Sequence, residues 1–189
     1  MRLRQLVACL SVAIWIGHPA LALPKEKSKW LRVDTENFYL LGNASESRNR
    51  EVGKGLEILR DVLSRMTPDG ENHSPLSTKV YVFKNPSSFR DYNIRQDGKP
   101  ADISAFFIKS IDGNYIALNS AGGSDLFYLV YHEYLHYFLA NNFPDLPLWL
   151  IEGLAEFYST FAWRGSNAEL GHPIQAHINW LGSNSLIPP

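Results

Sequence analysis

The chain has 189 residues, of which 45% are hydrophobic and 20% are charged, with a formal net charge of −1 and one cysteine, Cys9. A near-neutral chain without basic clusters is not the electrostatic footprint of a nucleic-acid-binding protein, so we expect no nucleic-acid partner.

The N-terminus has the pattern of a secretory signal peptide. Met1–Gln5 is a short basic start, residues 6–17 form an apolar run, and Ala20 and Ala22 are the small residues that a signal peptidase reads. The apolar run is too short for a membrane-spanning helix. We therefore expect cleavage after Ala22, export to the periplasm or the medium, and no stable membrane insertion afterwards. The alternative is an uncleaved membrane anchor.

Cleavage would change the chemistry of the mature chain. Loss of Arg2 and Arg4 moves the formal charge from −1 to −3, and loss of Cys9 leaves no thiol. Cysteine-protease chemistry and cysteine-ligated zinc are then excluded. About 165 residues remain, enough for one domain but not for two. We expect a single domain over residues 23–189.

The first half of the mature chain predicts a helix and several strands. Residues Trp30–Leu41 alternate as a strand with a turn at Asp34–Asn37. Ser45–Met66 is predicted as an amphipathic helix, because its apolar residues recur every three or four positions: Val52, Leu56, Leu59, Leu63 and Met66.

The elements that follow are shorter. Loops are expected at Thr67–Ser77 and Gln96–Asp102, a strand at Thr78–Phe83 and a helical turn or two at Pro86–Tyr92. Two further strands, Ile103–Ser110 and Tyr115–Asn119, are joined by a turn that contains Asp-Gly, which predicts a hairpin. Ser124 or Asp125 is expected to cap the helix that comes next.

The most informative stretch is VYHEYLHYFLAN, residues 130–141. His132 and His136 are four positions apart, so on a helix their imidazoles lie one above the other and can bind one metal ion, zinc by preference. Glu133 projects beside the metal, where it can accept a proton from water. The five-residue pattern His132–His136, HEYLH, is called the pentad below. Alone, a pentad of this type also occurs by chance in ordinary helices.

A second helix, Leu146–Thr160, is predicted to return against the first. Asn141–Pro144 ends the first helix, because the residue before a proline leaves the helical region, and Pro147 is tolerated in the first turn of the next. This helix carries Glu152 and Glu156. Gly153 and Ala155 are small, so we expect them to let the two backbones approach closely.

HEYLH followed by PLWLIEGLAEF resembles the glutamate-zincin metallopeptidases of the peptidase MA-like clan, which includes thermolysin and aminopeptidase N, and small bacterial peptidase MA-like domains. The resemblance is specific over Leu129–Ser159 and schematic upstream. It departs in the gap of fifteen residues between His136 and Glu152, a few fewer than in the large enzymes.

The resemblance implies an α+β, zincin-like fold, in which a small mixed or antiparallel sheet packs on the HExxH helix and on a following helix that carries the third ligand. It implies one Zn²⁺ held by His132, His136 and Glu152, with Glu133 as the catalytic general base. By the same resemblance, Glu156 hydrogen-bonds a metal-ligating histidine. The function implied is hydrolysis of peptide bonds in a peptide or protein substrate.

The resemblance also raises two matters at the edges of the site. The strand Ser104–Lys109, or its neighbour, is the candidate for binding extended substrate by backbone pairing, the alternative being a hairpin that caps the sheet. A polar loop is expected at Arg164–Gly171 and a short helix at Ile174–Leu181. Because the related small domains usually continue beyond this point, the resemblance implies a C-terminal part that is missing or unusually short.

Zinc peptidases also need a donor for the oxyanion that forms during attack. His172 and His177 are the candidates for that donor. Two readings compete with an active peptidase. One is a zinc-binding but catalytically inactive peptidase-like domain. The other is a secreted structural module with a fortuitous pentad.

Overall fold

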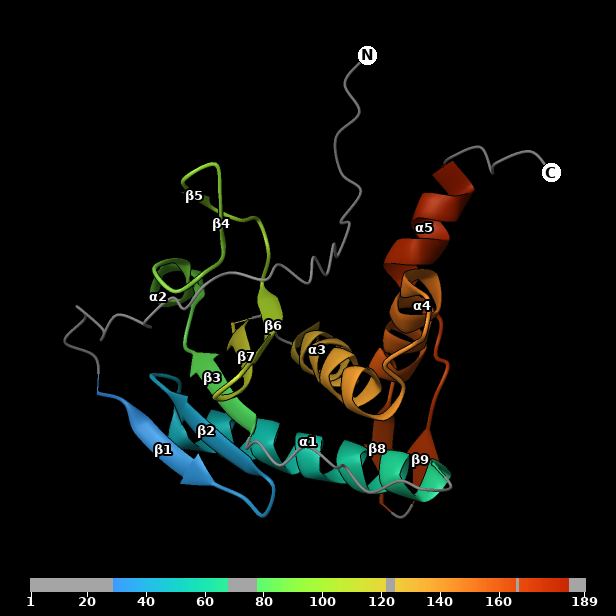
Figure 1. Ribbon diagram of the computed structural model, residues 1–189, viewed down its shortest axis with the longest axis horizontal. Helices are drawn as coiled ribbons and strands as arrows, with labels where there is room; N and C mark the ends of the chain where they lie inside the picture. Colours follow the sequence, from blue (N-terminus) through green and yellow to red (C-terminus); the bar gives the residue numbers. More distant parts are fainter. Residues whose placement is uncertain (1–28, 68–77, 122–124, 166, 184–189) are drawn as a thin grey trace.

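A five-stranded mixed sheet forms the centre of this computed structural model, which describes residues 29–67, 78–121, 125–165 and 167–183 (Figure 1). The strand order is β1-β2-β3-β7-β6. β2, β3 and β7 run parallel to one another, whereas β1 and β6 are antiparallel edges. The strands are β1 Leu31–Asp34, β2 Phe38–Gly42, β3 Thr78–Phe83, β6 Ala105–Ser110 and β7 Gly113–Asn119. The expectation of an α+β chain with a small mixed sheet is confirmed at this level.

Two helices cover one face of the sheet. α1, Glu46–Met66, begins after Ser45, whose hydroxyl accepts a hydrogen bond from the backbone of Arg48. Four residues of its predicted apolar stripe are buried, while Met66, the last residue of the helix, is 53% exposed. α3, Asp125–Asn142, lies beside α1, and both contribute to one core with the inward side chains of β2, β3 and β7.

The opposite face of the sheet carries a smaller aromatic cluster. Phe83, Phe89 and Phe106 are buried there with Ala117, next to α2, Pro86–Arg90. Because successive side chains of a strand point to opposite faces, the same strands supply both clusters.

Two small hairpins overlap the loops predicted at Gln96–Asp102 and Arg164–Gly171. β4 (Arg95–Gln96) pairs with β5 (Lys99–Pro100), and β8 (Ala162–Arg164) pairs with β9 (Asn167–Glu169). Most of their residues are exposed, so no alternation of apolar and polar residues marked them as strands. The turn of the first uses left-handed backbone at Asp97 and Gly98.

The C-terminal helix α5, Gln175–Ser183, projects from the end of α4 (Leu148–Ser159) and has no buried residue (Figure 1). No helix among the described residues has the length and apolar character needed to cross a bilayer. The predicted signal peptide, most of the loop expected at Thr67–Ser77, and Ser124 lie outside the described residues.

Candidate metal centre

The helix that carries the pentad is buried on almost every side. Every residue from 130 to 139 is buried in α3, between the sheet and α1 on one side and α4 on the other. A helix that is hydrophobic all round suits such a position. The aromatic residues near the two histidines therefore serve mainly as packing, as in the contact of Tyr134 with Phe38. Packing of this density fixes the direction of both imidazoles.

α4 returns along α3 after a short connection. Asn141 and Asn142 donate side-chain hydrogen bonds to the carbonyls of Tyr137 and Phe138, one turn back. Pro147 is the N-cap of α4 rather than a residue of its first turn. Ala155 is fully buried against α3, as expected.

The expectation for Gly153 is wrong. Gly153 is exposed, and a Cβ built on it would meet nothing within 4 Å. It lies on the outer side of α4, so the close approach of the two helices does not depend on it.

Three side chains from these helices converge. One donor atom from each of His132, His136 and Glu152 lies within 4.8 Å of the others. The two Nε2 atoms are 3.0 Å apart, and Oε2 of Glu152 is 3.7 Å from each. A tetrahedral zinc with bonds of 2.0–2.1 Å has ligand atoms about 3.3 Å apart, so the three donors fit such an ion with small movements. This group could hold a metal ion.

Burial keeps both imidazoles in the neutral form that binds metals. Burial lowers the pKa of His132, although the nearby Glu156 opposes the shift. For His136, burial and the neighbouring His132 lower the pKa to about 4. At neutral pH each ring therefore keeps a lone pair on one nitrogen.

Glu133 lies on the sheet side of the group. Burial raises the pKa of its carboxyl from 4.5 to about 8, and the negative charge of Glu152 raises it as well, while a hydrogen bond from the backbone of Phe107 opposes both. Phe107 belongs to β6, the edge strand. With a pKa of about 8, the carboxyl can change its protonation state near neutral pH, and it lies next to the edge strand of the sheet.

Glu156 lies beside His132, one helical turn after Glu152. Its Oε1 is 3.9 Å from Nδ1 of His132, which is longer than a hydrogen bond, and that buried nitrogen has no hydrogen-bond partner. Its Oε2 accepts a hydrogen bond from the hydroxyl of Tyr128 and lies 3.9 Å from Nε2 of His177. Glu156 is therefore close to the histidine that it was expected to contact, without bonding it directly.

The two histidines considered as oxyanion donors lie in different surroundings. His177, on α5, reaches Glu156 as described. His172 instead pairs with Glu169 at 3.0 Å on an exposed part of the chain and does not belong to the converging group.

Sequence reasoning missed the contacts of Tyr128 and Phe107. The position of Tyr128, four residues before His132 on the same helix, was the available signal. The contact of Phe107 is made by its backbone and has no signature in its side chain.

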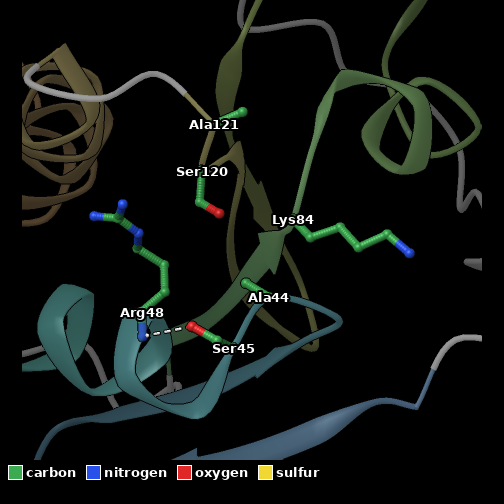
Figure 2. Close-up of a pocket in the computed structure, with 6 residues that line it drawn as sticks. All are labelled: Ala44, Ser45, Arg48, Lys84, Ser120 and Ala121. Atoms are coloured by element: carbon green, nitrogen blue, oxygen red, sulfur yellow. Dashed lines mark hydrogen bonds between the residues drawn. The ribbon is translucent and has the colours of Figure 1, made fainter.

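A hollow of about 300 Å³ lies elsewhere, at the carboxyl ends of β2, β3 and β7. Its lining residues are Ala44, Ser45, Arg48, Lys84, Ser120 and Ala121, none of which belongs to the metal group (Figure 2). Figure 2 shows the side chains of Arg48 and Lys84 pointing away from each other, and Arg48 is paired with Glu51 at 2.7 Å. The hollow offers no converging set of charges.

Comparison with known proteins gave no identity. No family model matches this chain, and no curated protein matches its sequence. The functional evidence for this chain is therefore the convergence of His132, His136 and Glu152 from α3 and α4.

Proposed function

We propose that this chain is a secreted or periplasmic zinc-dependent metallopeptidase of the glutamate-zincin type. The observation that carries the proposal is the convergence of His132, His136 and Glu152, with the buried carboxyl of Glu133 beside them. The motif resemblance supports the same assignment.

The donor set favours zinc. Two imidazole nitrogens and one carboxylate oxygen suit a borderline-soft ion, and three protein ligands leave a position open for catalysis. When bound, zinc supplies a Lewis acid that polarises a carbonyl group and makes water more acidic. The side chain of Glu152 is 27% exposed, so the group can be approached from the α4 side.

Glu133 has the properties of a general base. A base works best with a pKa near the working pH, and burial places the pKa of Glu133 at about 8 in the metal-free chain. In the proposed reaction its carboxylate takes a proton from the attacking water and delivers it to the leaving amine. His132, His136 and Glu152 would hold the metal beside it.

Substrate binding is proposed for the edge strand β6. β6 ends the sheet, and the backbone of Phe107 contacts the proposed base, so an extended peptide paired with this edge would pass beside Glu133. Leu148 and Trp149 lie one turn before Glu152 and are 63% and 74% exposed. They would offer an apolar rim to substrate side chains. Of the two histidines, His177 is retained as oxyanion donor, because it approaches Glu156.

The test combines metal analysis with hydrolysis. Purified wild-type chain is expected to contain zinc at near-unit stoichiometry and to cleave denatured proteins or peptides. Glu133→Gln should keep the metal and lose at least about a hundredfold in rate, the usual effect of removing a general base. Glu46→Gln is the matched control, because Glu46 is exposed on α1 and paired with Arg50.

Each other outcome has a definite meaning. Equal activity in wild type and Glu133→Gln would mean contamination and would refute the peptidase. Metal without activity across the substrate panel would indicate the inactive zinc-binding domain. If wild type contains no metal and Glu152→Gln has the same metal content and activity as wild type, the pentad is fortuitous.

A further inference from the structure

The carboxylate of Glu156 is approached from three sides by polar groups. The hydroxyl of Tyr128 donates a hydrogen bond to Oε2. Nε2 of His177 lies 3.9 Å from the same oxygen, and Nδ1 of His132 lies 3.9 Å from Oε1. The two oxygens of one carboxylate are thus divided between different partners.

Tyr128 and His132 are one helical turn apart on α3, with ring centroids 6.3 Å apart, and Glu156 from α4 lies against both. An O–H donor is directional, so its bond to Oε2 fixes the rotation of the carboxylate as well as its position. That rotation leaves Oε1 turned toward the imidazole. On α3, the hydroxyl of Tyr128 therefore bonds Oε2, while the imidazole of His132 lies on the side of Oε1.

We propose that Tyr128 is a positioning residue of the metal centre, which acts by holding Glu156 so that its free oxygen faces Nδ1 of His132. A carboxylate next to Nδ1 keeps the ring proton on that nitrogen, and Nε2 then carries the lone pair that faces His136 and Glu152. Nδ1 is buried without a hydrogen-bond partner, so a small movement of Glu156 would complete the bond. Tyr128 thereby selects the tautomer of His132 that can bind metal.

This inference rests on the proposed metal site, and binding measurements separate the two without any assay of hydrolysis. Zinc affinity is measured by competition with a chromophoric chelator for wild type, Tyr128→Phe, Glu156→Gln and the double variant. Removing a partner of a ligating histidine weakens metal binding by about 10- to 100-fold, which is expected for Glu156→Gln. Tyr128→Phe, one step further away, should weaken it by about 3- to 10-fold.

Two measurements distinguish the proposed positioning role of Tyr128 from a general structural effect of losing its hydroxyl. In the Glu156→Gln background, Tyr128→Phe should have little further effect, because the residue through which it acts has been changed. In the metal-free protein at mildly alkaline pH, the ring nitrogen shifts of His132 should indicate the Nδ1–H tautomer in wild type and a tautomer mixture in Tyr128→Phe.

Tyr131→Phe is the matched control, since Tyr131 is on the same helix but packs against Phe127 and Phe161. It should leave affinity and nitrogen shifts unchanged. If wild type binds zinc and Tyr128→Phe matches it in both affinity and shifts, the inference is overturned while the metal site stands. The inference is also overturned if Tyr128→Phe lowers zinc affinity by the same factor in the wild-type and in the Glu156→Gln backgrounds. A wild type that binds no zinc overturns the proposed function together with this inference.

Discussion

The two helices that form the candidate centre differ in how far they are removed from water. On α3, the side chains of His132 and His136 are 2% and 7% exposed, whereas on α4 those of Glu152 and Glu156 are 27% and 30% exposed. The histidines are fixed by the core around them. The carboxylates remain partly in contact with solvent.

This difference in burial determines how much stability each side of the group costs the metal-free protein. A buried polar group costs stability unless it is paired, and the α3 side of the group concentrates such groups. For the same reason, burial raises the pKa of Glu133 and lowers the pKa of both imidazoles. The α4 carboxylates retain part of their hydration, so they cost less in the metal-free protein.

Deletion of ligands from the two helices gives the largest expected effect. His136→Ala and Glu152→Ala should each lower zinc affinity by roughly a thousandfold, because the 10–16 kcal/mol of a structural zinc site is shared among a few ligands. They should differ in the metal-free protein. His136→Ala leaves a buried cavity and should cost about 2 kcal/mol of unfolding free energy, whereas Glu152→Ala should cost little.

Chelator competition measures the first effect, and urea unfolding in the presence of a strong chelator measures the second. Equal destabilisation by both variants would refute the contrast, because it would mean that Glu152 is as much a part of the folded core as His136.

The pH dependence of the metal-free protein should show the cost of Glu133. Its pKa of about 8 when folded exceeds the ordinary 4.5, so the folded state holds a proton that the unfolded state releases between these values. The associated stability is complete below pH 4.5 and is lost as pH rises through 8. Glu133→Gln cannot ionise, and above pH 8 it should therefore be more stable than wild type, by about 4 to 5 kcal/mol.

His136 gives the opposite sign. Its pKa falls from 6.5 to about 4 on folding, so its contribution to stability is present above pH 6.5 and is lost as pH falls through 4.

The prediction for Glu133 is measured by thermal unfolding of metal-free wild type and Glu133→Gln at pH values from 4.5 to above 8. A difference between the two that does not grow with pH between 4.5 and 8 would show that Glu133 is not buried as described.

Local sequence patterns predicted the parts of this molecule that depend on short-range geometry. The spacing of His132 and His136 brings them together on any helix, and the break at Asn141–Pro144 predicted that a second helix returns against the first. The choice of Glu152 as the third residue of the group came from the motif resemblance. The stripe of α1 and the β6–β7 hairpin follow from the same kind of periodicity.

What the sequence did not predict depends on contacts between distant elements. Nothing local separates Gly153, which faces solvent, from Gly55, where a Cβ on α1 would lie 2.7 Å from Phe127 and from Tyr131 on α3. The contact of Phe107 with Glu133 needs the register of β6 against α3, which no single stretch of residues sets. The division of the site into buried and half-exposed sides is likewise a property of the packed core.

These two glycines extend the comparison to sides of α3 and α4 away from the metal group: Gly55 of α1 packs against α3, and Gly153 lies on the exposed side of α4. Gly55→Ala places a methyl group against two aromatic side chains of α3, so it should destabilise the protein by about 1 to 2 kcal/mol despite the better helix propensity of alanine. Urea unfolding of the metal-free protein would measure it. An unchanged free energy of unfolding would mean that α1 and α3 can move apart without cost. That outcome would contradict the rigid packing described around α3.

Gly153→Ala gives the smallest expected effect and the opposite sign. The new methyl group meets nothing within 4 Å, and alanine is favoured over glycine inside a helix, so the unfolding free energy should rise by about 0.5 to 1 kcal/mol. Zinc affinity should stay unchanged, because Gly153 faces away from α3 while Glu152 keeps its position. If stability rises but hydrolysis falls, the outer surface of α4 contacts the substrate. If stability falls, α4 is packed more closely on its outer side than this structure describes, and the contrast between the two helices is weaker than their exposures indicate.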